Sequence, residues 1–128
     1  MKDGKHIILC IDDDPDVLVS LIIVLESRNY MVVTAPDARQ GLQAFKDSKP
    51  DIVIVDLMME EIDAGTRLVK EIQAIDRQVP IYMLSSTGDY LHGAVDISSL
   101  GLAGVFQKPL NSNTLLGLLE AKLKKSAS

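Results

Sequence analysis

The sequence has a single cysteine, no tract of low complexity and no apolar segment long enough to span a bilayer. With Cys10 alone, neither an internal disulfide nor a zinc cluster is possible, and its place within an apolar run predicts a buried, inert thiol. The first residues also lack the pattern of a secretory signal. We therefore expect a cytoplasmic protein that makes no use of a membrane.

Positive charge is also scarce, with 13 Lys and Arg residues against 18 Asp and Glu residues and a net charge of -5. Affinity for a phosphate backbone comes from clustered positive charge, so we expect no nucleic-acid binding through this chain. The basic concentration at Lys122, Lys124 and Lys125 is better explained as favourable charge at the end of a final helix.

What is present fits one folded domain. The 128 residues are 47% hydrophobic and 24% charged, which is enough apolar material for a core without a disulfide or a structural metal. The composition predicts a single domain over residues 1–128.

Short β-branched apolar runs alternate with segments that have helical spacing of apolar residues. Asp14 and Pro15 are typical of the cap and first position of a helix, and Asn111 or Ser112 is expected to cap the last one. The low helix propensity of residues 89–100 predicts only a marginal helix there. The five predicted strands are Ile7–Ile11, Met31–Thr34, Ile52–Val55, Ile81–Leu84 and Val105–Phe106.

This alternation predicts an α/β fold with right-handed crossovers and a doubly wound, five-stranded parallel sheet that has helices on both faces. In such a sheet, ligands bind beyond the carboxyl ends of the strands. The residues expected at those ends are Asp12, Asp13, Asp56, Ser85 and Lys108.

Three carboxylates, a hydroxyl and a lysine at one edge of a sheet indicate a specific chemistry. Carboxylates about 4 Å apart repel one another by roughly 4 kcal/mol at an effective dielectric of 20, and a hard divalent ion relieves that repulsion. Mg²⁺ suits a site with few carboxylates and an incoming phosphoryl group. Asp56 could then attack phosphorus to form an aspartyl phosphate, while Lys108 and Ser85 stabilise the phosphoryl oxygens.

Four runs carry a resemblance to a known family, and together they cover almost the whole chain in order. IILCIDDDPDVL, PDIVIVDLMMEEIDAG, VPIYMLSSTG and GVFQKPL resemble the successive landmarks of response-regulator receiver domains of two-component signalling. The resemblance implies a flavodoxin-like (βα)5 fold with strand order 2-1-3-4-5. It also implies Mg²⁺ as cofactor, a sensor histidine kinase or phosphotransfer protein as phosphoryl donor, and an unidentified output partner or output domain.

Site roles follow from the same resemblance, residue by residue. The domain would be no separate enzyme, because it would catalyse only its own phosphorylation and dephosphorylation. The matching positions are Asp12 and Asp13 for the acidic pair, Asp56 for the phosphoacceptor, Met58 for a metal contact through its backbone carbonyl, Ser85 for the hydroxyl and Lys108 for the lysine.

The chain departs from the family pattern at three places. Glu60 replaces the usual proline, Ala64 replaces the usual glycine, and Val105 stands where an aromatic switch residue is common, with Phe106 one place later. We therefore predict that signalling relies more on the segment from Ser85 to residue 100 than on a rotating ring.

Two other functions fit part of the pattern. Asp12 and Asp14 also resemble the start of haloacid-dehalogenase-type phosphatases, although that assignment leaves Asp56 unexplained. A receiver fold that only binds a partner, without being phosphorylated, is the second alternative. Its usual sign is loss of an acidic residue or the lysine, and this chain keeps them.

Overall fold

The computed structural model describes residues 4–57, 64–85 and 101–127. The helix expected over residues 89–100, the predicted metal contact at Met58 and the departure at Glu60 lie outside these residues. The strands are β1 (Ile7–Ile11), β2 (Met31–Ala35), β3 (Ile52–Asp56), β4 (Ile81–Ser85) and β5 (Gly104–Gln107). The helices are α1 (Pro15–Glu26), α2 (Ala38–Ser48), α3 (Ala64–Ile75) and α4 (Ser112–Ala127).

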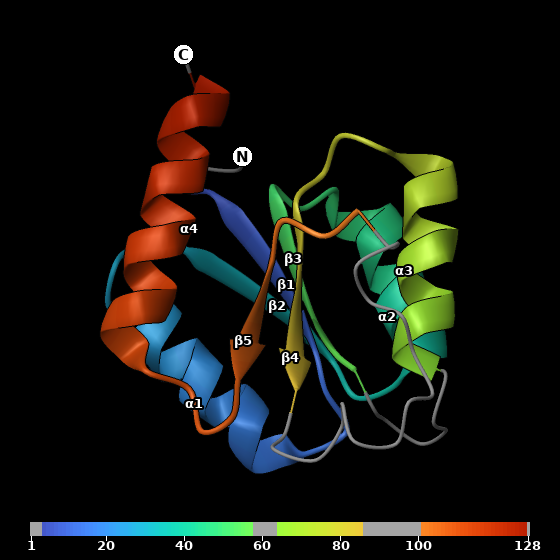
Figure 1. Ribbon diagram of the computed structural model, residues 1–128, viewed down its shortest axis with the longest axis horizontal. Helices are drawn as coiled ribbons and strands as arrows, with labels where there is room; N and C mark the ends of the chain where they lie inside the picture. The colour runs from blue at the N-terminus through green and yellow to red at the C-terminus, as the bar shows by residue number, and fades with distance from the viewer. Residues whose placement is uncertain (1–3, 58–63, 86–100, 128) are drawn as a thin grey trace.

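The five strands form one parallel sheet in the order β2-β1-β3-β4-β5, as the resemblance implies (Figure 1). Every residue of β1, β3 and β4 is buried, which is expected of parallel strands that are covered on both faces. The predicted strands are confirmed, but β2, β3 and β4 each end one residue later than predicted, and β5 is one residue longer at each end. Asp56 and Ser85 are therefore the last residues of strands and do not follow them.

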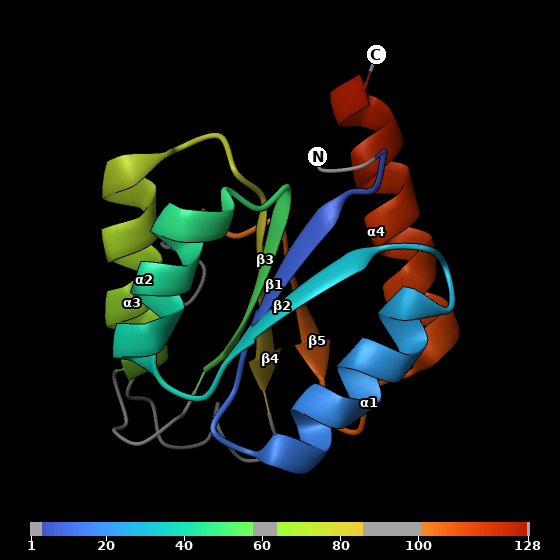
Figure 2. The same ribbon diagram turned by 180° about the vertical axis from the view of Figure 1, so that it is seen from behind.

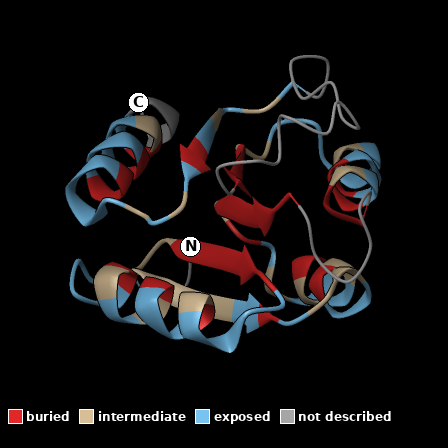
Figure 3. Ribbon diagram, turned by 60° about the horizontal axis from the view of Figure 1, so that its bottom comes forward, coloured by how far each residue is buried: buried red, intermediate tan, exposed pale blue. Residues whose placement is uncertain are grey.

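Helices cover the sheet on both sides, with α2 and α3 on one face and α1 and α4 on the other (Figures 1 and 2). Each face has its own core. Leu68 and Ile72 of α3 pack in the first core, and Leu21 of α1 and Leu119 of α4 pack in the second. Each helix has buried residues on the side that faces the sheet and exposed residues on its outer side (Figure 3).

Local signals fix where the helices begin. Asp14 caps α1, because its side chain accepts a hydrogen bond from the Asp16 N–H at 2.9 Å, and Pro15 takes the first position as predicted. At α4 the Thr114 N–H donates to Asn111 Oδ1 at 3.0 Å, so Asn111 is the cap among the two candidates. Both helices therefore start just after the loops that carry site residues.

The departure at Val105 has a structural counterpart on β5. Val105 is 40% exposed, whereas Phe106 is buried and stacks on Tyr82, with ring centroids 5.2 Å apart. Successive residues of a strand point to opposite faces, so Phe106 belongs to the core beneath α1 and α4. Phe106 therefore does not replace the aromatic ring that is absent at Val105.

Candidate functional site

The parallel register brings the predicted site residues to one edge of the sheet. Val55 pairs with Ile11, so Asp56 ends β3 level with Asp12, which directly follows β1. Ser85 at the end of β4 pairs with Gln107 at the end of β5, and Lys108 directly follows Gln107. The site thus combines strand ends that are far apart in the sequence, as expected for an open parallel sheet.

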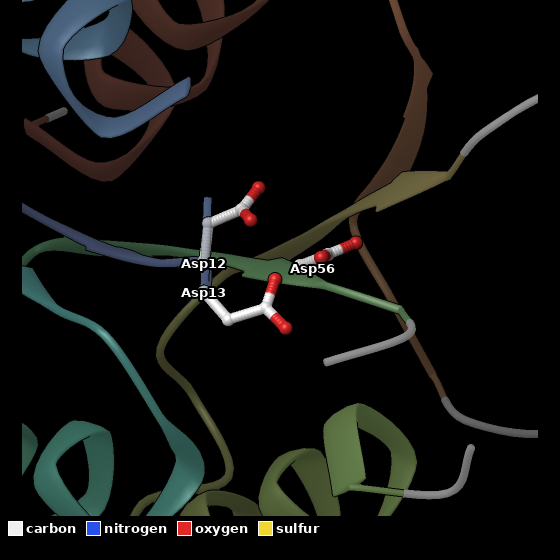
Figure 4. A group of neighbouring side chains, drawn as sticks. All are labelled: Asp12, Asp13 and Asp56. Atoms are coloured by element: carbon white, nitrogen blue, oxygen red, sulfur yellow. The ribbon is translucent and has the colours of Figure 1, made fainter. Parts of the chain in front are cut away.

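Asp12, Asp13 and Asp56 form an acidic cluster at this edge. Each offers a carboxylate oxygen, and these oxygens lie within 4.8 Å of one another. Asp13 points towards Asp56 from the end of β1 (Figure 4). Asp12 and Asp56 are buried, whereas Asp13 is exposed. Two such charges repel each other by about 3 to 4 kcal/mol at an effective dielectric of 20, so the cluster favours a bound cation.

Lys108 supplies the positive charge next to these carboxylates. Its Nζ lies 3.0 Å from Asp12 Oδ2 and 3.5 Å from Asp56 Oδ1. Although burial lowers the pKa of Lys108, the hydrogen bond to Asp12 and the charges of both carboxylates raise it above its usual value. The ammonium therefore stays protonated throughout the neutral range.

Backbone contacts hold Lys108 in place. Its N–H donates to the Ser85 carbonyl oxygen at 2.8 Å, which continues the pairing of β5 with β4 beyond the strand. The Lys108–Pro109 peptide bond is cis. The lysine is thus positioned by the same strand pair that ends in the Ser85 hydroxyl.

Asp12 is held by backbone contacts on two sides. Its N–H donates to the Ala35 carbonyl oxygen at 3.2 Å, and its Oδ1 accepts from the Asp14 N–H at 2.9 Å. Its Oδ2 is fully buried and lies 3.0 Å from the Lys108 Nζ. A buried carboxylate oxygen in this situation, beside two further carboxylates, fits a hard divalent cation such as Mg²⁺.

The structure thus places Asp12, Asp13, Asp56 and Lys108 together and puts the buried Ser85 at the end of the neighbouring strand. Asp14, which the phosphatase alternative needs as an acid or base, caps α1 instead.

Sequence reasoning missed one residue of the site. A Cβ at Gly65, in the first turn of α3, would lie 2.3 Å from the Asp56 carbonyl oxygen. The sequence did carry a signal for it, because Gly65 directly follows Ala64, which stands at the usual glycine position.

A groove of about 680 Å³ lies beside the site, between α1 and the segment that joins β5 to α4. Lys108 is on its wall, and Val24, Leu110 and Leu115 make it largely apolar. On α1 the side chain of Ile23 also lines this groove and is 65% exposed. The periodicity of α1 predicted its buried side but not this groove.

Comparison with known proteins agrees with the fold. Residues 8–120 match the family described as the response regulator receiver domain. The chain belongs to the response regulator receiver domain family.

The similarity of this receiver domain to characterised proteins is spread over almost its whole length. It is 35% identical to the transcriptional regulatory protein GlrR of Escherichia coli over 94% of its own residues and 27% of that protein. It is 30% identical to the DNA-binding response regulator MtrA of Mycolicibacterium smegmatis over 98% of its residues and 54% of that protein. The chain thus spans only about a quarter to a half of these relatives.

Solved structures agree with the fold. A response regulator receiver domain protein from Clostridium thermocellum is 27% identical, with a TM-score of 0.82 over 95% of this chain and 98% of that one. A putative response regulator from Chloroflexus aurantiacus is 28% identical, with a TM-score of 0.80 over 92% of this chain and 97% of that one. The flavodoxin-like fold is confirmed.

Among the described residues, no helix is both long and apolar enough to cross a membrane. The expectation of a cytoplasmic location stays a prediction, as does the single domain over residues 1–128.

Proposed function

We propose that this receiver domain accepts a phosphoryl group on Asp56. The observation that carries the proposal is the contact between Lys108 and two buried carboxylates, at 3.0 Å to Asp12 and 3.5 Å to Asp56, within an acidic cluster. The cluster offers oxygen ligands to a cation, and the lysine offers a fixed positive charge to an incoming phosphoryl group.

The reaction is a displacement at phosphorus. An oxygen of Asp56 forms the new P–O bond while the bond between phosphorus and the donor's leaving atom breaks, and the electron pair departs with that atom. The Lys108 ammonium lies near the attacking carboxylate and stabilises negative charge on the phosphoryl oxygens. The Ser85 hydroxyl, at the end of the neighbouring strand, is proposed to donate a hydrogen bond to the same group.

Asp12, Asp13, Asp56 and the backbone carbonyl of Met58 are proposed to hold Mg²⁺, which would neutralise charge on the cluster and on the phosphoryl group. Asp12 is suited to this role because the Asp14 N–H and the Lys108 ammonium orient its carboxylate. Asp13 is exposed and so provides the solvent-facing side of the site.

We infer that the phosphoryl donor is a sensor histidine kinase or a phosphotransfer protein and that the phosphorylated domain changes its affinity for an output partner or output domain. The names of GlrR and MtrA describe a transcriptional regulatory protein and a DNA-binding response regulator, and this chain matches 27% and 54% of their lengths. DNA binding through the present residues is not proposed, because their net charge is -5.

Intact-mass measurement after incubation with acetyl phosphate tests the proposal. With Mg²⁺ the chain should gain one phosphoryl group, and it should gain none in EDTA or as Asp56→Asn. Asp14→Asn is the matched control, because asparagine also caps helices, so this variant should be labelled like the unchanged chain.

Each alternative predicts a different result. A haloacid-dehalogenase-type phosphatase would lose activity in Asp12→Asn and Asp14→Asn and keep it in Asp56→Asn. A pure interaction module would show no labelling under conditions in which a known receiver is labelled. Acetate release that exceeds the turnover of the Asp56 phosphoryl group would contradict the proposal that the domain acts only on itself.

A further inference from the structure

Three helical glycines of the described residues differ in what a side chain at their position would meet. A Cβ at Gly117 would touch nothing within 4 Å. At Gly41 its three nearest atoms would all belong to the buried Ile11 side chain, at 2.8 to 3.1 Å, and none to the backbone of Asp56. At Gly65 it would meet backbone oxygens, at 2.3 Å from Asp56 and 2.7 Å from Leu57. The φ angle of Gly65 is not positive, so its backbone conformation does not require glycine. Glycine is needed at this position only because there is no space for a side chain.

The backbone next to Gly65 cannot easily move away. The Leu57 N–H donates to the Leu84 carbonyl oxygen at 2.8 Å, which ties the end of β3 to β4. Leu57 and Ala64 are both buried in the core under α2 and α3. A side chain at position 65 would therefore push the first turn of α3 and the end of β3 apart by about 1 Å to reach an ordinary contact of 3.4 Å.

We propose that Gly65 is a positioning residue for phosphoryl transfer. Its missing side chain lets the first turn of α3 pack directly on the backbone of Asp56, and this contact fixes the Asp56 carboxylate at its distance from Lys108 and the acidic cluster. The inference rests on the proposed role of Asp56.

The effect of a side chain at position 65 should be large. A displacement of about 1 Å between reacting groups can lower a rate by on the order of 100-fold, because attack requires alignment and short distances. Gly65→Ala should therefore be labelled on the order of 10- to 100-fold more slowly than the unchanged chain at saturating Mg²⁺.

The experiment compares Gly65→Ala with Gly41→Ala, both in a Gly117→Ala background that adds helix stability. Far-UV circular dichroism and urea titration establish that each variant is folded at the labelling temperature. Labelling with acetyl phosphate is followed by intact mass over a Mg²⁺ series, which separates the maximal rate from the half-saturating Mg²⁺ concentration. A merely structural role would change the urea midpoint and leave the maximal rate of the folded protein unchanged.

The expected result is a lower maximal rate in Gly65→Ala and near-normal rates in Gly41→Ala and in the background. Equal maximal rates in Gly65→Ala and Gly41→Ala would overturn the positioning role and leave the proposed function intact. Failure to label the unchanged chain would overturn both proposals.

If Gly65→Ala does not fold at the labelling temperature, all variants are labelled in the presence of trimethylamine oxide, which favours the folded state. The maximal rate of Gly65→Ala should again be lower than that of Gly41→Ala, and equal rates would overturn the inference.

Discussion

Replacement of Lys108 by methionine should destabilise the protein at neutral pH, because it leaves two buried carboxylates without their positive partner. At 3.0 and 3.5 Å and an effective dielectric of 20, each attraction amounts to about 5 kcal/mol before the costs of desolvation are subtracted. Removing one partner of a buried ion pair typically costs about 3 to 5 kcal/mol.

Part of this cost is offset, because the variant no longer has to remove the lysine ammonium from water on folding. We therefore expect Lys108→Met to lower the free energy of unfolding by about 2 to 4 kcal/mol at pH 7 in EDTA.

The loss should depend on pH at high pH and on metal. Because the pKa of Lys108 is raised, the stabilisation that its charge provides is constant below about pH 10 and is lost only as the pH rises above that value. Mg²⁺ should restore much of the stability, since it binds only the folded site.

Urea unfolding followed by circular dichroism measures these differences. Lys124→Met is the matched control, because Lys124 forms only an exposed pair with Glu120 at 3.4 Å, worth less than about 0.5 kcal/mol. The reasoning would be refuted if Lys108→Met and Lys124→Met changed stability equally in EDTA, or if Lys108→Met and Asp12→Asn had additive effects.

Three further predictions concern residues outside the acidic cluster. Gly117→Ala should raise the free energy of unfolding by about 1 kcal/mol in urea titrations, because a methyl group there meets nothing and favours the helix; no gain would contradict the open surroundings. Phe106→Ala should lower it by about 3 to 5 kcal/mol and Val105→Ala by far less, since only Phe106 is buried. Burial, reinforced by Asp12, raises the pKa of Cys10 to about 12, so a thiol reagent at pH 8 should modify it only after unfolding in urea; rapid modification of the folded protein would contradict this.

The sequence was sufficient for the strands and for the edge at which the site lies. Continuous apolar runs indicated strands buried on both faces, and a parallel sheet then required Asp12, Asp56 and Lys108 to converge. The aligned strand ends follow from topology, so they could be predicted without knowledge of any side-chain contact.

Other features depend on three-dimensional contacts that no local pattern records. Pro15 already marked Asp14 as the cap in the sequence, but only the structure separates the buried Asp12 from the exposed Asp13. The approach of Gly65 to Asp56 depends on the angle at which α3 meets β3, which composition and periodicity do not specify.

Strand direction also separates the reactive edge from the first strand's start and the last helix's end. All five strands point towards the acidic cluster, while the start of β1 and the end of α4 lie at the opposite side of the molecule (Figure 1). Each of the longer strands has five residues and spans roughly 17 Å. A fluorescent tag or a tether to a surface that joins the chain before β1 or after α4 could therefore leave the acidic edge open to a large phosphoryl donor.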